Sequence, residues 1–97
     1  MTMPRRGSRK VVVAGSTYRF MVRKERPWRV SVTVEDEANP GRVLMVGFGE
    51  NRCPGVGTAE VAAFIAHAKK SGWTPTAMGN FYMTDTAVDE ALVGINR

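Results

Sequence analysis

The stretch TAEVAAFIAHAKKSGWTP, residues 58–75, contains the clearest helical pattern of the chain. Its apolar side chains recur at the i, i+3, i+4, i+7 spacing of one helical face, namely Val61, Phe64, Ile65 and Ala68. We expect Thr58 to be the N-cap, because its hydroxyl can accept a hydrogen bond from a free backbone N–H. Gly72 suits the left-handed conformation that follows a helix, and Trp73 can then fold back onto the helix end. The stretch therefore predicts one amphipathic helix, from about Thr58 to Ser71.

Four segments before this helix have the features of β-strands, at residues 10–14, 17–23, 28–35 and 42–48. In the second and third, apolar and polar side chains alternate, which predicts one buried and one solvent-facing side. The buried side is expected to carry Tyr18, Phe20, Val22, Trp28, Val30 and Val32. Gly15-Ser16 indicates a tight hairpin turn between the first two strands.

Two weaker segments follow the helix. Phe81-Tyr82-Met83 is typical of a short strand, and residues 84–86 can cap a last helix that carries Val88, Leu92 and Ile95. This order predicts an α+β fold of two layers: an antiparallel sheet of about four strands with one main helix packed on one face, a short fifth strand and a C-terminal helix. We divide the chain into a flexible basic arm (1–9), a single α+β domain (10–84) and a C-terminal helical tail (85–97).

The size and composition bound the class of protein. Ninety-seven residues make one domain, and the single cysteine, Cys53, cannot form an intramolecular disulfide. No apolar stretch approaches the roughly 20 residues of a membrane span, and the start does not read as an export signal. These features predict a cytoplasmic protein with no membrane partner.

The net charge of +5 is distributed unevenly. Residues 1–34 hold nine Lys or Arg and one acid, whereas residues 35–97 hold five Lys or Arg and eight acids. A basic region can bind polyanions, and the residues predicted to do so are Arg5, Arg6, Arg9, Lys10, Arg19, Arg23 and Arg29. The alternative is that the two halves of the chain complement each other, within a monomer or between subunits.

No catalytic or metal-binding set stands out. His67 is the only histidine and falls beside the apolar stripe of the helix, and Cys53 has no partner for nucleophilic catalysis nearby in sequence. Gly55-Val56-Gly57 opens the helix without the Gly-Lys-Ser/Thr of a nucleotide-binding loop. We therefore predict no catalytic residue, no metal and no cofactor.

From Val11 to about Met83 the chain resembles a group of small bacterial proteins of the kind carried on mobile, integron-type gene cassettes. The residues that carry the resemblance are 14–20 (AGSTYRF), 30–35 (VSVTVE) and 72–75 (GWTP), with Gly79 and Phe81 beyond. The resemblance implies the same strand meander followed by a helix. It implies no activity, cofactor or site residue.

Three hypotheses for function follow. The first is a non-enzymatic interaction or regulatory domain that forms a homodimer through Val88, Leu92 and Ile95 of its tail. The second is binding of nucleic acid, or of an acidic protein, by the basic arm and the outer sheet face. The assignment of Tyr18, Phe20 and Trp28 to the apolar face argues against base stacking in that mode. The third is a small-ligand site between the 47–57 loop, Trp73 and Asn80.

Overall fold

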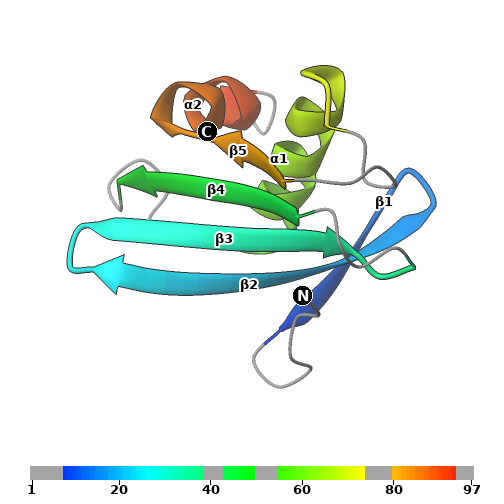
Figure 1. Cartoon of the computed structure of the whole chain (residues 1–97), viewed down its shortest axis with the longest axis horizontal. Helices are drawn as coiled ribbons and strands as arrows, with labels where there is room; N and C mark the ends of the chain where they lie inside the picture. Colours follow the sequence, from blue (N-terminus) through cyan, green and yellow to red (C-terminus); the bar gives the residue numbers. More distant parts are fainter. Residues whose placement is uncertain (1–7, 39–42, 50–54, 74–79, 94–97) are drawn as a thin grey trace.

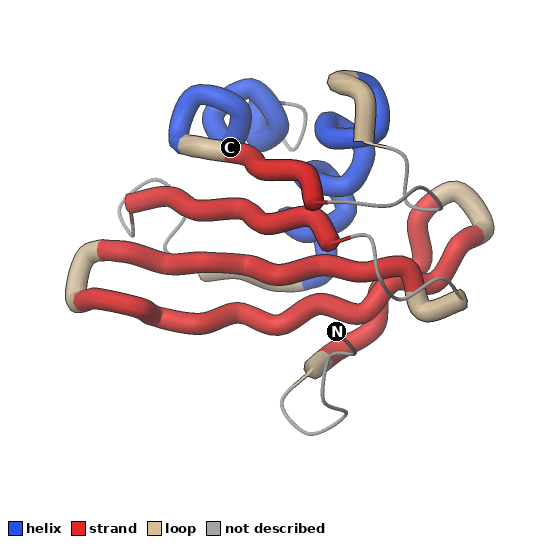
Figure 2. Tube along the Cα trace, viewed as in Figure 1, coloured by secondary structure: helices blue, strands red, loops and turns tan. Residues whose placement is uncertain are grey.

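The structure is a computed structural model that describes residues 8–38, 43–49, 55–73 and 80–93. Its elements are, in order, β1 (Arg9–Val13), β2 (Ser16–Arg26), β3 (Arg29–Asp36), β4 (Val43–Gly49), α1 (Thr58–Lys70), β5 (Asn80–Met83) and α2 (Asp85–Val93). The strands form one five-stranded sheet in sequence order. Every neighbouring pair is antiparallel except β4 and β5, which are parallel. Both helices pack on the same face of this sheet (Figures 1 and 2), which confirms the predicted two-layer α+β fold.

The β1–β2 hairpin turns at Ala14-Gly15, one residue earlier than predicted. Val13 pairs with Ser16, and the two residues between them have φ values of 51° and 81°. Positive φ at both central residues is the mark of a type I′ turn, whose twist matches that of the flanking strands. Gly15 takes this conformation without strain, and Ala14 accepts it to keep the two-residue turn.

The β2–β3 hairpin is longer than predicted, because β2 continues to Arg26 and only Pro27 and Trp28 form its turn. The expectation that Trp28 and Val22 are buried is wrong. The Trp28 side chain is 62% exposed and Val22 is also exposed. Val22 pairs with Val32 on the helix side, but this end of the hairpin is not covered. Trp28 lies in the turn, outside both strands, so strand alternation does not decide its face.

Helix α1 begins and ends at the predicted residues, although its N-cap differs. The N-cap is Gly57 rather than Thr58, and the Gly57 N–H donates to the Glu60 carboxylate at 2.8 Å. A glutamate at the third helical position can satisfy the capping residue's own N–H, so the Thr58 hydroxyl is not needed for that contact.

The C-terminal end of α1 confirms the prediction for Gly72 and Trp73. Gly72 has a φ of 117°, and the Trp73 N–H donates to the Ala68 carbonyl at 2.8 Å. Together with the bond from Gly72 N–H to the Lys69 carbonyl, this is a Schellman motif. The Trp73 ring then packs against Tyr18, with ring centroids 5.9 Å apart.

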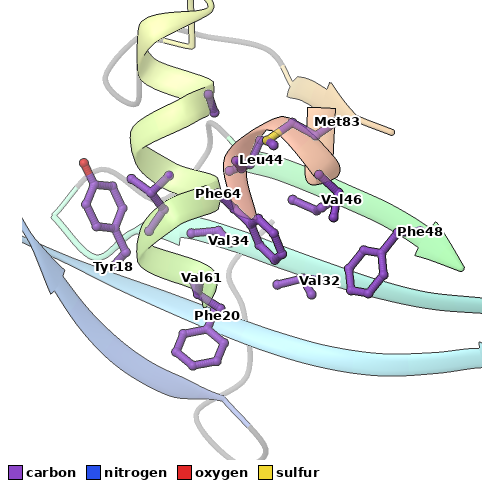
Figure 3. Close-up of a cluster of buried hydrophobic side chains, with 14 of the residues drawn as sticks. Tyr18, Phe20, Val32, Val34, Leu44, Val46, Phe48, Val61, Phe64 and Met83 are labelled. Atoms are coloured by element: carbon purple, nitrogen blue, oxygen red, sulfur yellow. The ribbon is translucent and has the colours of Figure 1, made fainter. Parts of the chain in front are cut away.

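The core lies between the helices and the inner sheet face (Figure 3). Val61 and Phe64 of α1 face the sheet, where the buried residues include Phe20, Val32, Val34, Leu44, Val46 and Phe48. The Phe48 and Phe64 rings lie 5.9 Å apart. Aromatic pairs at this separation add to the stability gained by burial.

Helix α2 packs in the same core, against α1 and β4. Val88 is fully buried and Leu92 is 6% exposed, so both side chains are used within their own chain. Ile95, like residues 1–7 of the predicted arm, lies outside the described residues. Neither of the two described helices has the length and apolar character needed to cross a membrane.

Candidate polyanion interface on the outer sheet face

The outer face is defined here as the sheet face opposite to α1 and α2. Paired residues on neighbouring strands point to the same side of a sheet, so the register gives its members row by row. One row is Arg23, Ser31 and Gly47, and another is Arg19, Glu35 and Val43. In the second row Glu35 is buried, whereas Arg23 in the first is exposed. The open part of the outer face therefore lies toward the β2–β3 turn.

A β-bulge adds an arginine to this end of the face. Lys24 pairs with Val30, but the next pair is Arg26 with Arg29, so the register shifts at Glu25. Without the shift, Arg26 would point to the helix side, whereas pairing with Arg29 places it on the outer face. Bulges commonly re-aim a side chain in this way. Arg23, Arg26 and Arg29, which we call the arginine cluster, thus share one end of one face.

The Arg29 side chain lies close to the sheet surface over Gly47 of β4. Gly47 pairs with Ser31, whereas Arg29 itself pairs with Gly49, so Gly47 is its diagonal neighbour. A Cβ atom built on Gly47 would lie 2.8 Å from the Arg29 Nη2 atom. The guanidinium therefore lies across β4 at a position that lacks a side chain. Gly47 has an ordinary strand conformation, so its role here is close approach and not a special backbone angle.

Trp28 lies beside the arginine cluster at the tip of the hairpin. The Arg26 Cζ atom is 5.9 Å from the centroid of the Trp28 ring, within the range of a cation–π interaction. Sequence reasoning missed both residues, because Trp28 continues the alternation of the third strand and Arg26 precedes a proline. The sequence did contain a signal for a turn at this point. Pro27 stands between basic Arg26 and aromatic Trp28, and a proline after a strand marks a turn.

Two of the predicted basic residues on the outer face are already paired with a carboxylate. The Lys10 Nζ and Arg19 Nε atoms lie 3.0 and 3.1 Å from Glu37 Oε2. The hydrogen bond from Lys10 and the nearby positive charges hold the pKa of Glu37 below its ordinary value of 4.5. Within the described part of the chain, the arginine cluster has no ion-pair partner of this kind.

The structure separates the remaining predicted basic residues from this site. Arg9 pairs with Phe20, which places it on the helix side of the sheet, and its Cζ atom lies 5.2 Å from the Phe20 ring centroid. Arg5 and Arg6 lie outside the described residues. Of the seven predicted residues, only Arg23 and Arg29 are brought together on the open part of the outer face.

An exposed aromatic residue lies on the other side of the outer face. Thr33 pairs with Met45 and Met45 pairs with Tyr82, so all three point away from the helices. Tyr82 is 65% exposed and Met45 is also exposed. The Asn80 amide donates to the Tyr82 hydroxyl at 3.5 Å. Tyr82 thus lies on the outer face at its far edge strand, β5, and Trp28 lies at the tip of the β2–β3 hairpin beside Arg26.

His67 has a structural setting at the interface between the two helices. Its Nε2 atom lies 3.1 Å from Glu90 Oε1, which links α1 to α2. Its Nδ1 atom is buried and has no hydrogen-bond partner in the described structure. Cys53 falls outside the described residues, and no group of three metal-ligating side chains gathers within those that are described.

The predicted small-ligand site is not assembled as expected. Gly57 and Trp73 lie at opposite ends of α1, whose thirteen residues span roughly 20 Å at the usual helical rise. Trp73 is also 2% exposed and packs on Tyr18, so its ring does not line an open site. Gly57 is therefore not close to Trp73, while residues 50–54 of the predicted loop lie outside the described residues.

Comparisons of the chain with protein-family models, with curated proteins and with solved structures gave no match. The resemblance to gene-cassette proteins stays a prediction, and function must be argued from the chain itself.

Proposed function

We propose that this domain binds the phosphate backbone of nucleic acids through the arginine cluster. The observation that carries the proposal is the gathering of Arg23, Arg26 and Arg29 on one open face, without an ion-pair partner among the described residues. Nearby Lys10 and Arg19 share Glu37, so among the described residues of this face the cluster is the group of cations without a paired carboxylate. Unpaired, partly desolvated cations attract polyanions and steer their approach.

The residue type favours phosphate over a general acidic surface. A guanidinium presents a planar fork of N–H donors that matches phosphate oxygens, and it is weakly hydrated for a cation. Arg29 is supported on the sheet by the close approach to Gly47, so less freedom is lost when it binds. Ser31, in the row of Arg23, can add a hydroxyl donor of the kind that commonly contacts phosphates.

The homodimer hypothesis is less well supported than nucleic-acid binding. Two of the three residues predicted to contact a second copy, Val88 and Leu92, are buried in their own chain. An apolar helical tail needs a surface to cover it, and α1 and β4 provide one. The apolar side chains of this helix are therefore covered within the monomer, so a second copy is not needed to cover them.

The proposal is tested by fluorescence anisotropy with a labelled 12-nucleotide single strand and its duplex, titrated at several salt concentrations. If three arginines neutralise about three phosphates, log K should fall with log [salt] with a slope of roughly −2 for the single strand or −2.7 for the duplex. Absence of binding to both at about 50 mM salt would contradict the proposal, because electrostatic binding is strongest there.

Paired variants locate the interface. Arg23→Gln should weaken binding and reduce the salt slope by about 0.7–0.9, the contribution of one phosphate contact. Arg9→Gln is the matched control, since it removes the same charge from the helix side of the sheet. An equal loss in the two variants would show that net charge, and not this face, governs binding.

A further inference from the structure

We propose that the outer face takes single-stranded nucleic acid, with unpaired bases stacked on Trp28 and Tyr82 at its two sides. This inference rests on the proposed function, and it names the substrate class of the same site. It starts from the correction of Trp28 from a buried to an exposed residue. The predicted burial of Tyr18, Phe20 and Trp28 was the reason to discount base stacking. Tyr18 and Phe20 are buried as predicted, whereas Trp28 is exposed.

Trp28 is built as a stacking platform. Its side chain is 62% exposed, although a large aromatic ring is normally buried. Arg26 lies 5.9 Å from the ring centroid and can hold the ring by a cation–π interaction while its charge remains available to a phosphate. Proteins that bind single strands combine aromatic rings with basic side chains that follow the backbone.

Tyr82 provides the second platform, across the sheet. Trp28 lies five residues before Thr33 along the β3 direction, and Thr33 is joined to Tyr82 through Met45. At about 3.3 Å per residue and 4.8 Å per strand, the two aromatic residues are roughly 19 Å apart. That distance accommodates a short run of nucleotides on one face and leaves the arginine cluster at the Trp28 end.

The outer face is low over the part of β4 that lies nearer the hairpin, whereas Met45 lies beside Tyr82 at the other end. Gly47 and Gly49 occupy β4 next to Ser31 and Arg29, so no side chain rises from β4 at these two positions. Arg29 itself lies across Gly47. The low surface over Gly47 and Gly49 leaves room for the riboses and bases of a bound strand. The Arg29 guanidinium can donate hydrogen bonds to the phosphates of that strand.

The substrate class follows from what each form of nucleic acid exposes. In a duplex the bases are stacked on one another, so their flat faces are not available to protein rings, whereas single-strand recognition relies on aromatic stacking. One exposed ring beside the arginine cluster and another on the outer face therefore favour an unpaired strand. An acidic protein would engage the arginines but has no use for a pair of stacking platforms.

Intrinsic fluorescence offers a direct test, because the chain has two tryptophans in opposite environments. Trp73 is 2% exposed and Trp28 is 62% exposed. Oligothymidylate of 12 nucleotides should quench the emission of Trp28, whereas inorganic polyphosphate, which has charge but no bases, should bind without comparable quenching. The quenching should disappear in Trp28→Leu, in which only Trp73 emits.

Affinity completes the test. Trp28→Leu and Tyr82→Leu should each weaken oligothymidylate binding by about 5- to 150-fold and leave duplex binding nearly unchanged. Trp28→Phe and Tyr82→Phe, which keep a ring, should retain most of the affinity.

Equal affinity for single strand and duplex, with no effect of either Leu variant, would overturn this inference and leave nucleic-acid binding intact. Loss of binding to all nucleic acids, together with binding to polyglutamate, would overturn both proposals in favour of an acidic protein partner.

Discussion

Replacement of Gly72 tests whether the end of α1 is held by backbone geometry. Gly72 has a φ of 117°, where side-chain-bearing residues rarely lie, yet a Cβ built there has no atom within 4 Å. Gly72→Ala therefore isolates backbone strain from steric contact. Such strain costs on the order of 1–3 kcal/mol, and alanine recovers about 0.4–1 kcal/mol by restricting the unfolded chain. The expected net loss of stability is about 1–2 kcal/mol.

Thermal unfolding followed by circular dichroism measures this loss. At about 2.1 cal/mol/K per residue, the 97 residues give an unfolding entropy of about 0.2 kcal/mol/K, so Gly72→Ala should lower Tm by roughly 5–10 °C. Gly72→Val should lower it further, because a β-branched residue tolerates positive φ even less well. The rigid stop matters because it seats Trp73 on Tyr18.

Gly55→Ala is the matched control. Gly55 also has no atom within 4 Å of a built Cβ, but its φ is not in the positive region. Its Tm should stay the same or rise by a few degrees, since only the unfolded state is affected. A Gly72→Ala protein that melts at or above the wild-type temperature would refute the assignment of strain to this residue.

Two further predictions concern α2 and the ion pairs of Glu37. Leu92→Ala should lower the free energy of unfolding by about 2–4 kcal/mol, because it opens a cavity in the core. Val93→Ala, at a position that is 78% exposed, should change it by less than about 0.5 kcal/mol. Chemical denaturation measures both, and similar effects of the two variants would contradict the packing of α2 in the core. The pKa of Glu37 is lowered in the folded state, so its contribution is present above the unfolded pKa and is lost as pH falls through the folded pKa. The Tm difference between wild type and Glu37→Gln should accordingly be present at pH 7, begin to shrink below about pH 4.5 and vanish once the pH is below the lowered pKa of Glu37. A difference that does not shrink as the pH falls below 4.5 would argue against the pairing with Lys10 and Arg19.

Sequence patterns predicted the fold well where the geometry of an element depends only on its own residues. The stripe from Val61 to Ala68 and the stop at Gly72 depend on spacing and on a backbone angle, both of which are readable from residue type. Alternation also placed Phe20 and Val32 correctly on the buried side. The parallel pairing of β5 with β4 was not predicted, because the pairing partner of a short strand depends on the path of the chain before it.

The site was harder to predict because it depends on what covers each face and on where a register shifts. Trp28 and Val22 follow the buried pattern, but no helix covers that end of the hairpin. The bulge at Glu25 moves Arg26 to the outer face, and no residue in 24–26 specifies it in advance. Conversely, the pairing of Lys10 and Arg19 with Glu37 joins β1 and β2 to the bend after β3, which sequence spacing does not reveal.

The most direct test of the proposed interface is a titration of the isotope-labelled protein with 12-nucleotide oligothymidylate, followed by amide chemical shifts. The account predicts that the largest changes fall on the outer face, at Arg23, Arg26, Ser31 and Gly47 near the β2–β3 turn and at Tyr82 on β5, and that the amides of α1 and α2 change little. Changes concentrated on the helices, or no changes at about 50 mM salt, where electrostatic binding is strong, would contradict the assignment of this face as the nucleic-acid interface.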